Sequence, residues 1–396
     1  MPYVRIGTDY YKKGEIPLHS GDTYNTLLKW KKSEIVTDMG KDYLHQIKKY
    51  DGFCLIPSHT EYKQEIKCFY NKYEELDHHF SEGTYHKTKT FLKHIFGEQY
   101  DLGLDFLSIL WHKPSQVLPI LCLVSSERKT GKTTFLNWLK MVFQGNMTIN
   151  KNEDFRSRFN SDWAEKLIIA VDEVLLDKKE DSERIKNLST ARSYKKESKG
   201  VDKVESYFFG KFILCSNNED NFIWIDKDEI RYWVRKVPTF KDSEEDPDLL
   251  DNLKKELPQF MQFLHTRKIK APKKTRMWFT KDQINTEALN NLVKGNKTYL
   301  NKEIEEVLSD AFIKFEVDEL KFSLSDLVDM LSKNNIRVST SKISEFLKNH
   351  YKLESKNGAY SKYHVAVSPF NGSLFTEETK HKGRYFTFNK KDFQND

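Results

Sequence analysis

A glycine–lysine–threonine triplet stands where an apolar strand gives way to a helical pattern. The run Leu121–Val124 leads into a polar loop, and the helical pattern starts at Phe135, directly after the triplet. Loop amides and a helix N-terminus in this order form a phosphate-binding loop, or P-loop. Its lysine neutralises the β- and γ-phosphates of ATP, and the next hydroxyl binds Mg²⁺. The candidate nucleotide-binding residues are Ser126, Glu127, Arg128, Lys129, Thr130, Gly131, Lys132, Thr133 and Thr134, with Lys132 also catalytic.

This loop departs from the usual Gly-x-x-x-x-Gly-Lys-Thr pattern. Ser126 occupies the first glycine position, and Thr130 stands where a second glycine is frequent. Serine makes some turns less easily than glycine does. Because Gly-Lys-Thr also occurs by chance, the strands that follow must decide whether the loop binds a nucleotide.

Two later apolar runs end in polar residues of the required kind. Leu167–Val171 is followed by Asp172 and Glu173, and the run ending at Cys215 is followed by Ser216 and Asn217. We expect Asp172 to help hold Mg²⁺ and Glu173 to act as the base that polarises the attacking water. Asn217 is a candidate to orient that water, although an asparagine here also suits a plain turn.

A segment rich in arginine and aromatic residues follows. Arg231 is our candidate arginine finger, a side chain that stabilises the transition state of a neighbouring subunit, and Arg235 is the second choice. The alternative is that these arginines only stack on Tyr232 and Trp233 or pair with an acid.

The elements that position these residues predict an α/β fold. Apolar runs at 119–124, 167–171 and 212–215 alternate with helical patterns, which is typical of a parallel sheet. We predict an N-terminal α+β accessory domain at 1–95, in which 62–73 reads as helical, and a P-loop ATPase core at 96–260. A basic linker at 261–281 and a further domain at 282–396 would follow.

The composition is that of a folded, modestly basic protein. The chain has 38% hydrophobic and 31% charged residues and a net charge of +6. The linker has seven basic and no acidic residues, which favours contact with a phosphate backbone.

The order of these motifs resembles that of superfamily 3 helicases, the AAA+-like helicases of small viruses, phages and plasmids. The chain is most similar to the primase-helicase proteins of phages and mobile elements, and the stretch from Lys93 to Val174 carries most of the resemblance. It implies an AAA+-like core, a hexameric ring, ATP and Mg²⁺ bound between subunits, and translocation on single-stranded DNA. It also implies a hairpin whose lysines contact DNA; Lys199 matches its tip, with Lys195 and Lys196 beside it, although these could form a plain surface turn.

Two helical patterns and two alternating strands at the C-terminus suggest a winged-helix-like domain. Ser323 and Ser339 or Ser341 are plausible helix N-caps. Lys342 and Lys348 would then line a recognition helix that contacts DNA. The alternative is a small α+β domain that binds protein.

The resulting hypothesis is an ATP-dependent replicative DNA helicase that acts on single-stranded or forked DNA. A nucleotide-switched initiator or adaptor without processive unwinding is the alternative. Residues 1–95 are too short and too poor in acidic clusters for a polymerising domain, so any primase would be a separate protein.

The sequence has no signal peptide and no apolar run of membrane-spanning length. This predicts a cytoplasmic protein, located in the host cell if a phage encodes it.

Overall fold

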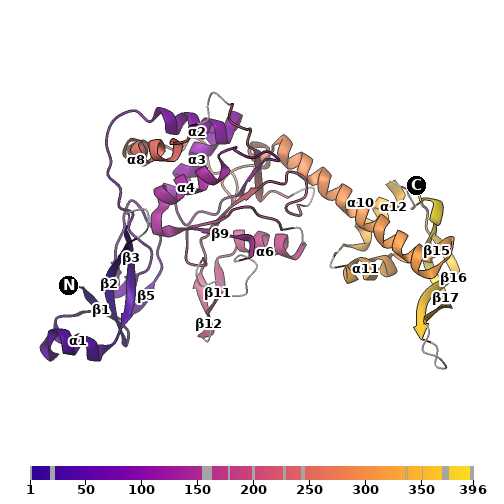
Figure 1. The fold of residues 1–396 in the computed structure, drawn as a ribbon, viewed down its shortest axis with the longest axis horizontal. Coiled ribbons are helices and arrows are strands. Elements are labelled where there is room, and N and C mark those ends of the chain that lie inside the picture. Colours follow the sequence, from indigo (N-terminus) through magenta and orange to yellow (C-terminus); the bar gives the residue numbers. More distant parts are fainter. Residues whose placement is uncertain are drawn as a thin grey trace. The chain divides into compact units, whose positions relative to one another are not determined.

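The fold was obtained as a computed structural model (Figure 1). It describes residues 2–17, 23–153, 163–176, 179–198, 201–225, 229–241, 246–334, 336, 338–349, 351–367 and 374–392. Unit 1 comprises Met1–Leu175, Arg184–Glu219 and Asp228–Leu289; unit 2 comprises Leu176–Glu183, Asp220–Lys227 and Asn290–Asp396. Each unit is treated by itself below.

The N-terminal part of unit 1 is a small sheet with one helix. Its strand order is β3-β2-β1-β4. Tyr3, Ile35 and Ile47 pack together in one buried cluster, and Val4, Ile6 and Tyr50 form another, since alternate residues of a strand point to opposite faces of the sheet. The elements are β1 (Tyr3–Ile6), β2 (Asp9–Pro17), β3 (Thr23–Trp30), α1 (Lys32–Met39) and β4 (Lys48–Tyr50).

The segment 62–73, expected to be helical, is instead part of a second small sheet. It contains β6 (Glu65–Ile66) and β7 (Phe69–Asn71), and β7 also pairs with β5 (Gly52–Cys54). Between β6 and β7, Lys67 and Cys68 both have positive φ, 47° and 63°. Two left-handed residues make the tight turn of a two-residue hairpin, and that turn ends any helix.

The centre of unit 1 is a five-stranded parallel sheet in the order β14-β8-β13-β10-β9. Its strands are β8 (Ile120–Val124), β9 (Met147–Asn150), β10 (Ile168–Val171), β13 (Lys211–Ser216) and β14 (Tyr232–Lys236). The three predicted apolar runs became β8, β10 and β13, and every residue of these strands is buried. Burial on both faces explains why they read as continuous apolar runs.

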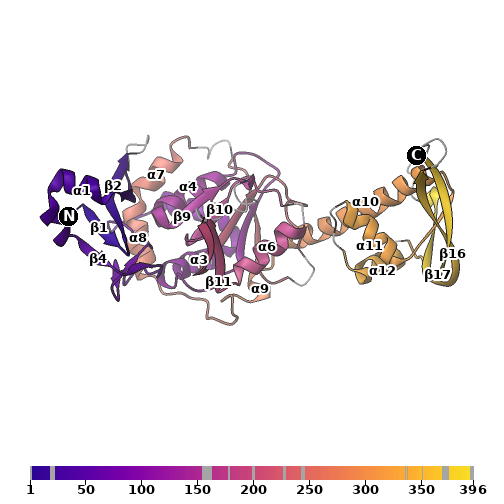
Figure 2. The same cartoon turned by 90° about the horizontal axis from the view of Figure 1, so that it is seen from below.

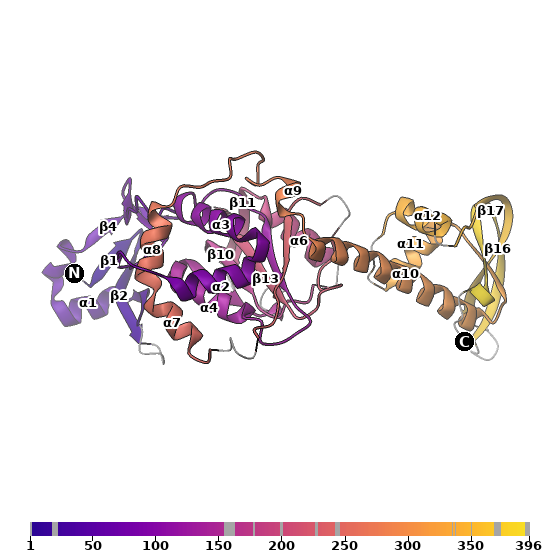
Figure 3. The same cartoon turned by 90° about the horizontal axis from the view of Figure 1, so that it is seen from above.

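Helices cover one face of this sheet, where α2, α3, α4, α7 and α8 lie side by side (Figure 3). Their apolar side chains form the main buried cluster together with Leu121, Leu123 and Ile213 of the sheet. Their bounds are α2 (His86–Phe96), α3 (Tyr100–His112), α4 (Lys132–Phe143), α7 (Leu249–Lys255) and α8 (Leu257–Thr266).

The remaining elements of unit 1 include a protruding hairpin. The antiparallel strands β11 (Ser193–Ser198) and β12 (Val201–Tyr207) lie on the side away from α2 and α3 (Figures 1 and 2). Helix α6 (Lys179–Ser189) precedes the hairpin, and α9 (Lys281–Ile284) follows the helical layer along the chain.

The segment 261–281, expected to be a linker, lies within unit 1. Arg267 forms a buried ion pair with Asp105 of α3, Nη1 to Oδ1 at 2.5 Å, and Asp105 also accepts hydrogen bonds from the N–H groups of Lys270 and Ala271. Trp278 and Phe279 are buried in the main cluster. This segment is therefore fastened to the helical layer along its length.

Unit 2 contains the predicted pair of helices and pair of strands. Strands β15 (Glu319–Phe322), β17 (Leu374–Asn389) and β16 (Lys356–Val367) form an antiparallel sheet in that order. It packs with α10 (Glu287–Phe315), α11 (Leu324–Lys333) and α12 (Thr340–Asn349) through residues such as Leu308 and Leu347. The predicted cap at Ser323 is confirmed, because its hydroxyl accepts the N–H of Asp326 in a reciprocal capping box. A DNA-binding winged helix stays a prediction.

Among the described residues, none of the helices combines the length and the apolar character that crossing a membrane requires.

Removing the Asp105 carboxylate should destabilise unit 1 strongly. We expect Asp105→Ala to lower the free energy of unfolding by about 3–5 kcal/mol, since it leaves the Arg267 charge buried and unpaired. The measurement is urea unfolding followed by tryptophan fluorescence. The matched control is Asp101→Ala, which removes an exposed partner of Lys270 at 3.2 Å and should cost under about 1 kcal/mol. Equal losses would contradict a supporting role for the buried pair.

Candidate functional site

The predicted phosphate-binding loop joins the carboxyl end of β8 to the start of α4. Lys129 and Gly131 have positive φ, 55° and 82°, and together they turn the chain into the helix. Ser126 lies outside the left-handed region, so its backbone does not require glycine. The N–H of Ser126 donates to Glu219 Oε1 at 2.6 Å, which fixes the start of the loop.

The N-terminus of α4 is open to an acceptor. Gly131 is its N-cap and supplies no side-chain hydrogen bond. The first N–H groups of a helix have no intrahelical partner, and they carry a partial positive charge that attracts anions. This helix end has the properties of an anion site.

Lys132 adds a buried cation to this helix end. Its side chain donates to Thr130 Oγ1 at 3.0 Å, and within the described part of the chain it forms no ion pair, although the residue is only 7% exposed. Burial lowers the pKa of Lys132, and the nearby charges of Asp172 and Glu219 oppose that shift. A buried ammonium without a bonded carboxylate is costly, and a bound phosphate group would offset the cost.

Asp172 lies beside the next hydroxyl. Thr133 Oγ1 donates to Asp172 Oδ2 at 2.9 Å, although the two residues come from different elements. Glu173 follows in the left-handed region with φ of 53°, and its N–H donates to Asp172 Oδ1 at 3.1 Å. A hydroxyl beside a carboxylate suits Mg²⁺, which takes one or two protein ligands and completes its shell with water and phosphate oxygens. The described residues contain no group of three or more His, Cys, Asp or Glu side chains that could hold a metal ion.

The carboxyl end of β13 brings Asn217 to the same edge of the sheet. The Ser216 hydroxyl donates to the carbonyl of Val174 at 2.8 Å, tying the ends of β13 and β10 together. Asn217 follows as an exposed residue. Because β8, β10 and β13 are parallel, their carboxyl ends meet at one edge, which is where ligands bind in open α/β sheets. The structure thus places Lys132, Thr133, Asp172, Glu173 and Asn217 along that edge.

Sequence reasoning missed Glu219, which joins the loop to β14. Its carboxylate accepts the Ser126 N–H and pairs with Lys236 Nζ at 2.7 Å. Burial alone would raise the pKa of Glu219, but the hydrogen bonds from Lys236 and Ser126 outweigh burial and hold it below its ordinary value. Glu219 stays ionised and braces the loop.

Two aromatic rings hold the other side of the loop, and neither was predicted. His94 of α2 contacts the carbonyl of Thr130 through Nε2 at 3.1 Å, and its ring stacks on Phe240 at 4.1 Å between centroids. A Cβ added at Gly131 would lie 3.0 Å from the Phe240 ring and 3.1 Å from Phe91. Glycine is favoured here, because a side chain would be strained by the positive φ and would press against these two rings. His94 falls in the stretch that carried the resemblance; Phe240 left no sequence signal.

A cavity of about 470 Å³ lies next to this loop. His94 and Lys236, which contact the loop and its brace, line the cavity. Arg235 also lines the cavity and is paired with Glu98. Arg235 is buried in that ion pair. This agrees with the alternative that the arginines of this segment pair with an acid. The complete lining is Lys93, His94, Gly97, Glu98, Arg235, Lys236, Pro238, Thr286, Glu287 and Ala288.

Arg231 lies at the opposite edge of the sheet from the loop. It precedes β14, whose first residue pairs with Ile120 and whose last residue pairs with Val124, next to the loop. A strand of this length separates the edges by on the order of 15 Å. Both carboxylate oxygens of Glu229 accept from Arg231 Nη1 at 2.8 Å. Arg231 therefore does not reach the site of its own chain.

The predicted DNA-binding residues lie on two elements. Lys195 and Lys196 are on strand β11 of the hairpin, whereas Lys199 lies outside the described residues. In unit 2, Lys342 is half-buried near the start of α12 and Lys348 is exposed in its last turn. Their contact with DNA stays a prediction.

Comparison with known proteins finds one family model that is similar to the stretch containing this site. Residues 123–235 match a family described as a family of unknown function (DUF5906), and this range runs from β8 through Arg235. No curated protein matches the chain significantly.

Solved structures of the NrS-1 C-terminal region share the fold. The apo structure of residues 305–718 has a TM-score of 0.57 and 14% identity, covering 94% of each chain. An A-form apo structure of that region has a TM-score of 0.57 and 16% identity, covering 90% of this chain and 84% of that one. The likeness extends over nearly the whole chain and concerns the fold alone.

A side chain at Gly131 should distort the loop. We expect Gly131→Ala to lower the free energy of unfolding by about 1–3 kcal/mol, from backbone strain and from contact with the Phe240 ring. In a Phe240→Ala background the same change should cost about 1 kcal/mol less, because the ring it meets is gone. A double-mutant cycle by chemical denaturation measures this coupling. Additive losses would show that Phe240 does not constrain Gly131.

Proposed function

We propose that this chain is an ATP-dependent DNA helicase of a phage or mobile-element replication system, which hydrolyses ATP between the subunits of a ring and moves along single-stranded DNA. The observation that carries the proposal is the hydrogen bond from Thr133 to Asp172, 2.9 Å long, at an uncapped helix end that also holds the buried Lys132. Two elements far apart in sequence supply these groups, since Lys132 and Thr133 begin α4 and Asp172 follows β10.

The residues at this helix end fit a magnesium nucleotide. The open N–H groups of α4 and the ammonium of Lys132 are donors for phosphate oxygens, and Thr133 and Asp172 are oxygen ligands for Mg²⁺. When bound, Mg²⁺ neutralises charge on the phosphates. Lys132 then gains the anionic partner that the described residues do not provide. The 470 Å³ cavity beside His94 has room for the nucleoside.

Glu173 and Asn217 are suited to handle the attacking water. The Glu173 side chain is exposed, and its backbone lies in the left-handed region. Such backbone strain is typical of functional positions. Its carboxylate accepts a proton from water as general base. Asn217, at the end of the neighbouring strand, offers an amide that can orient that water by hydrogen bonding.

Arg231 acts in the site of a neighbouring subunit in this scheme. Its position at the far edge of the sheet removes it from its own site, so a role in hydrolysis requires a second copy of the chain. A closed ring provides such a contact for every subunit. Glu229 holds the guanidinium in place, and 30% of the Arg231 side chain stays exposed. The hexameric state and the replication setting come from the resemblance to superfamily 3 helicases.

The first test is the ATPase rate with and without single-stranded DNA. We expect DNA to stimulate turnover, and both Lys132→Ala and Glu173→Gln to lower it by about 100-fold or more. Glu173→Gln should still bind ATP, because it removes the base and leaves the phosphate contacts. The control is Lys89→Ala, which removes an exposed lysine of α2 that does not line the cavity and should retain full turnover. Nucleotide binding without turnover, alongside tight duplex binding, would refute the motor and favour a nucleotide-switched initiator.

The second test asks whether Arg231 acts between subunits. Arg231→Ala and Lys132→Ala should each be inactive, with the loss for Arg231→Ala about 1,000-fold if it is a finger. An equimolar mixture, once reassembled, should recover about a quarter of the wild-type rate, since random assembly pairs an intact Lys132 with an intact Arg231 at that fraction of interfaces. Light scattering would verify assembly of each sample. No recovery in assembled mixtures would contradict a role in trans.

A further inference from the structure

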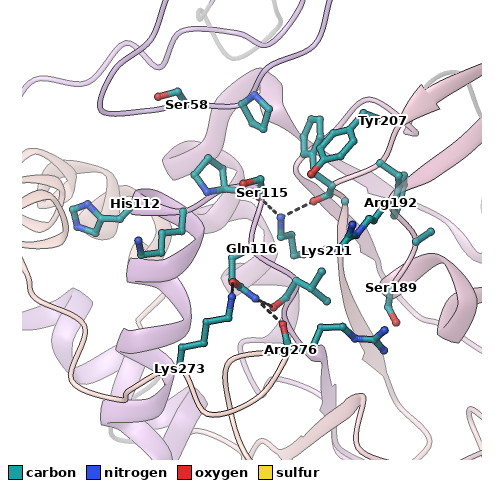
Figure 4. A pocket seen from close by; sticks show the side chains of 18 of the residues that line it. Ser58, His112, Ser115, Gln116, Ser189, Arg192, Tyr207, Lys211, Lys273 and Arg276 are labelled. Atoms are coloured by element: carbon teal, nitrogen blue, oxygen red, sulfur yellow. Dashed lines mark hydrogen bonds between the residues drawn. The ribbon is translucent and has the colours of Figure 1, made fainter.

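A second cavity, of about 790 Å³, lies at the amino-end edge of the same sheet (Figure 4). Lys211, the first residue of β13, and the segment 112–117 that precedes β8 form its floor. Tyr207 and Arg192 belong to the base of the β11–β12 hairpin, and Lys273 and Arg276 come from the basic segment after α8. The proposed ATP site lies at the other edge, so this cavity is separate from it.

The lining of this cavity is strongly basic. Lys113, Arg192, Lys273 and Arg276 are exposed side chains, whereas Glu61 is the one carboxylate among the described residues that line it. Within the described part of the chain, the side chains of Lys113, Arg192 and Arg276 have no carboxylate partner. Several unpaired cations around one hollow attract a polyanion.

An exposed aromatic ring accompanies these cations. Tyr207 ends β12 and is 50% exposed, and its ring lies 6.2 Å from that of Phe209, which is buried. Exposed rings next to basic side chains are the arrangement by which proteins bind single-stranded nucleic acid, because bases stack on the ring while cations contact phosphates. Duplex DNA hides its bases from such a ring.

The cavity wall is held rigidly by internal hydrogen bonds. Lys211 is buried and donates to the carbonyls of Pro114 and Phe209 (Figure 4). Gln116 donates to the carbonyl of Arg276 at 2.8 Å and accepts from Lys273 Nζ at 2.8 Å. These bonds tie the floor segment to the Lys273 side chain and to the backbone of Arg276, so this part of the lining is in place before any ligand binds.

We propose that this cavity binds a nucleotide unit of single-stranded DNA, with Arg192, Arg276 and Lys113 on the phosphates and Tyr207 stacked on a base. The site deepens the proposed helicase function, because it gives the DNA a contact at the base of the hairpin whose lysines were predicted to touch it. It does not depend on ATP hydrolysis. The basic segment, first interpreted as a linker, contributes Lys273 and Arg276 to the lining of the site.

The test is the affinity for a fluorescent oligo(dT), measured by anisotropy without nucleotide and over a range of salt concentrations. We expect Arg192→Ala/Arg276→Ala to weaken binding on the order of tenfold at 0.1 M salt and to reduce the slope of log K against log salt by about 1.4, for two lost phosphate contacts. Tyr207→Ala should weaken binding at least about fivefold, and Tyr207→Phe should retain it, because stacking needs only the ring.

The matched control is Lys268→Ala/Lys274→Ala, which removes two exposed charges from the same segment outside the cavity and should leave the salt slope nearly unchanged. If both double variants reduce the affinity and the salt slope equally, the proposed site is wrong, and the binding reflects general attraction of DNA to the basic segment. Complete displacement by dTMP at the same nucleotide concentration would assign the cavity to a free nucleotide instead.

This outcome is separable from that of the proposed function. If wild type binds oligo(dT) and the cavity variants bind equally well, the cavity inference is wrong and the motor stands. If wild type binds no oligo(dT) with or without ATP, both the cavity and DNA translocation are wrong. Thermal unfolding and light scattering of each variant identify losses that come from misfolding or disassembly, and Tyr207→Phe provides a folded comparison in either case.

Discussion

The candidate site depends on one electrostatic constraint, which is the burial of Lys132 without a bonded counter-ion. An ammonium group held away from water is stabilised only by what surrounds it. Here it has one hydroxyl partner, and the nearest carboxylates are bound elsewhere, Asp172 by Thr133 and Glu219 by Ser126 and Lys236. The neighbouring helix end adds a partial positive charge. Positive charge therefore accumulates at one point of the sheet edge. His94 and Phe240 pack against the loop next to Lys132 and hold the loop in place.

The parallel sheet gives the two edges of unit 1 different chemistry. At the carboxyl edge, strand ends deliver hydroxyl, carboxylate and amide groups to a small region. At the amino edge, the segments entering β8 and β13 form the basic hollow next to the hairpin. The three central strands between the edges, β8, β10 and β13, are buried throughout, so small shifts of these strands would disturb the core as well as either site. A reaction at one edge and a polymer at the other would thus share one rigid body.

Much of this arrangement was predictable because it rests on local signals. The strands β8, β10 and β13 are short apolar runs ended by polar residues, and Ser323 lies directly before a helical pattern with Asp326 in the capping position. Long-range partners leave no such signal. Glu219, His94 and Phe240 hold the phosphate-binding loop from elements far away in sequence, so only the folded chain brings them together. The wrong helix at 62–73 has a related cause. Lys67 and Cys68 adopt left-handed backbone angles, and neither residue type predicts such a conformation from sequence.

The ion pair between Asp105 and Arg267 has a practical consequence for dissecting the chain. A fragment that stops near 260, where the predicted core ends, would lack Arg267 and leave the Asp105 carboxylate buried without its partner. It would also lack Trp278 and Phe279, which belong to the main buried cluster. Such a truncation would yield insoluble or molten material and invite the mistaken conclusion that the ATPase region cannot fold alone. A fragment that extends through Leu289, the last residue of unit 1, keeps Arg267, Trp278 and Phe279, and its expression boundary should be drawn there.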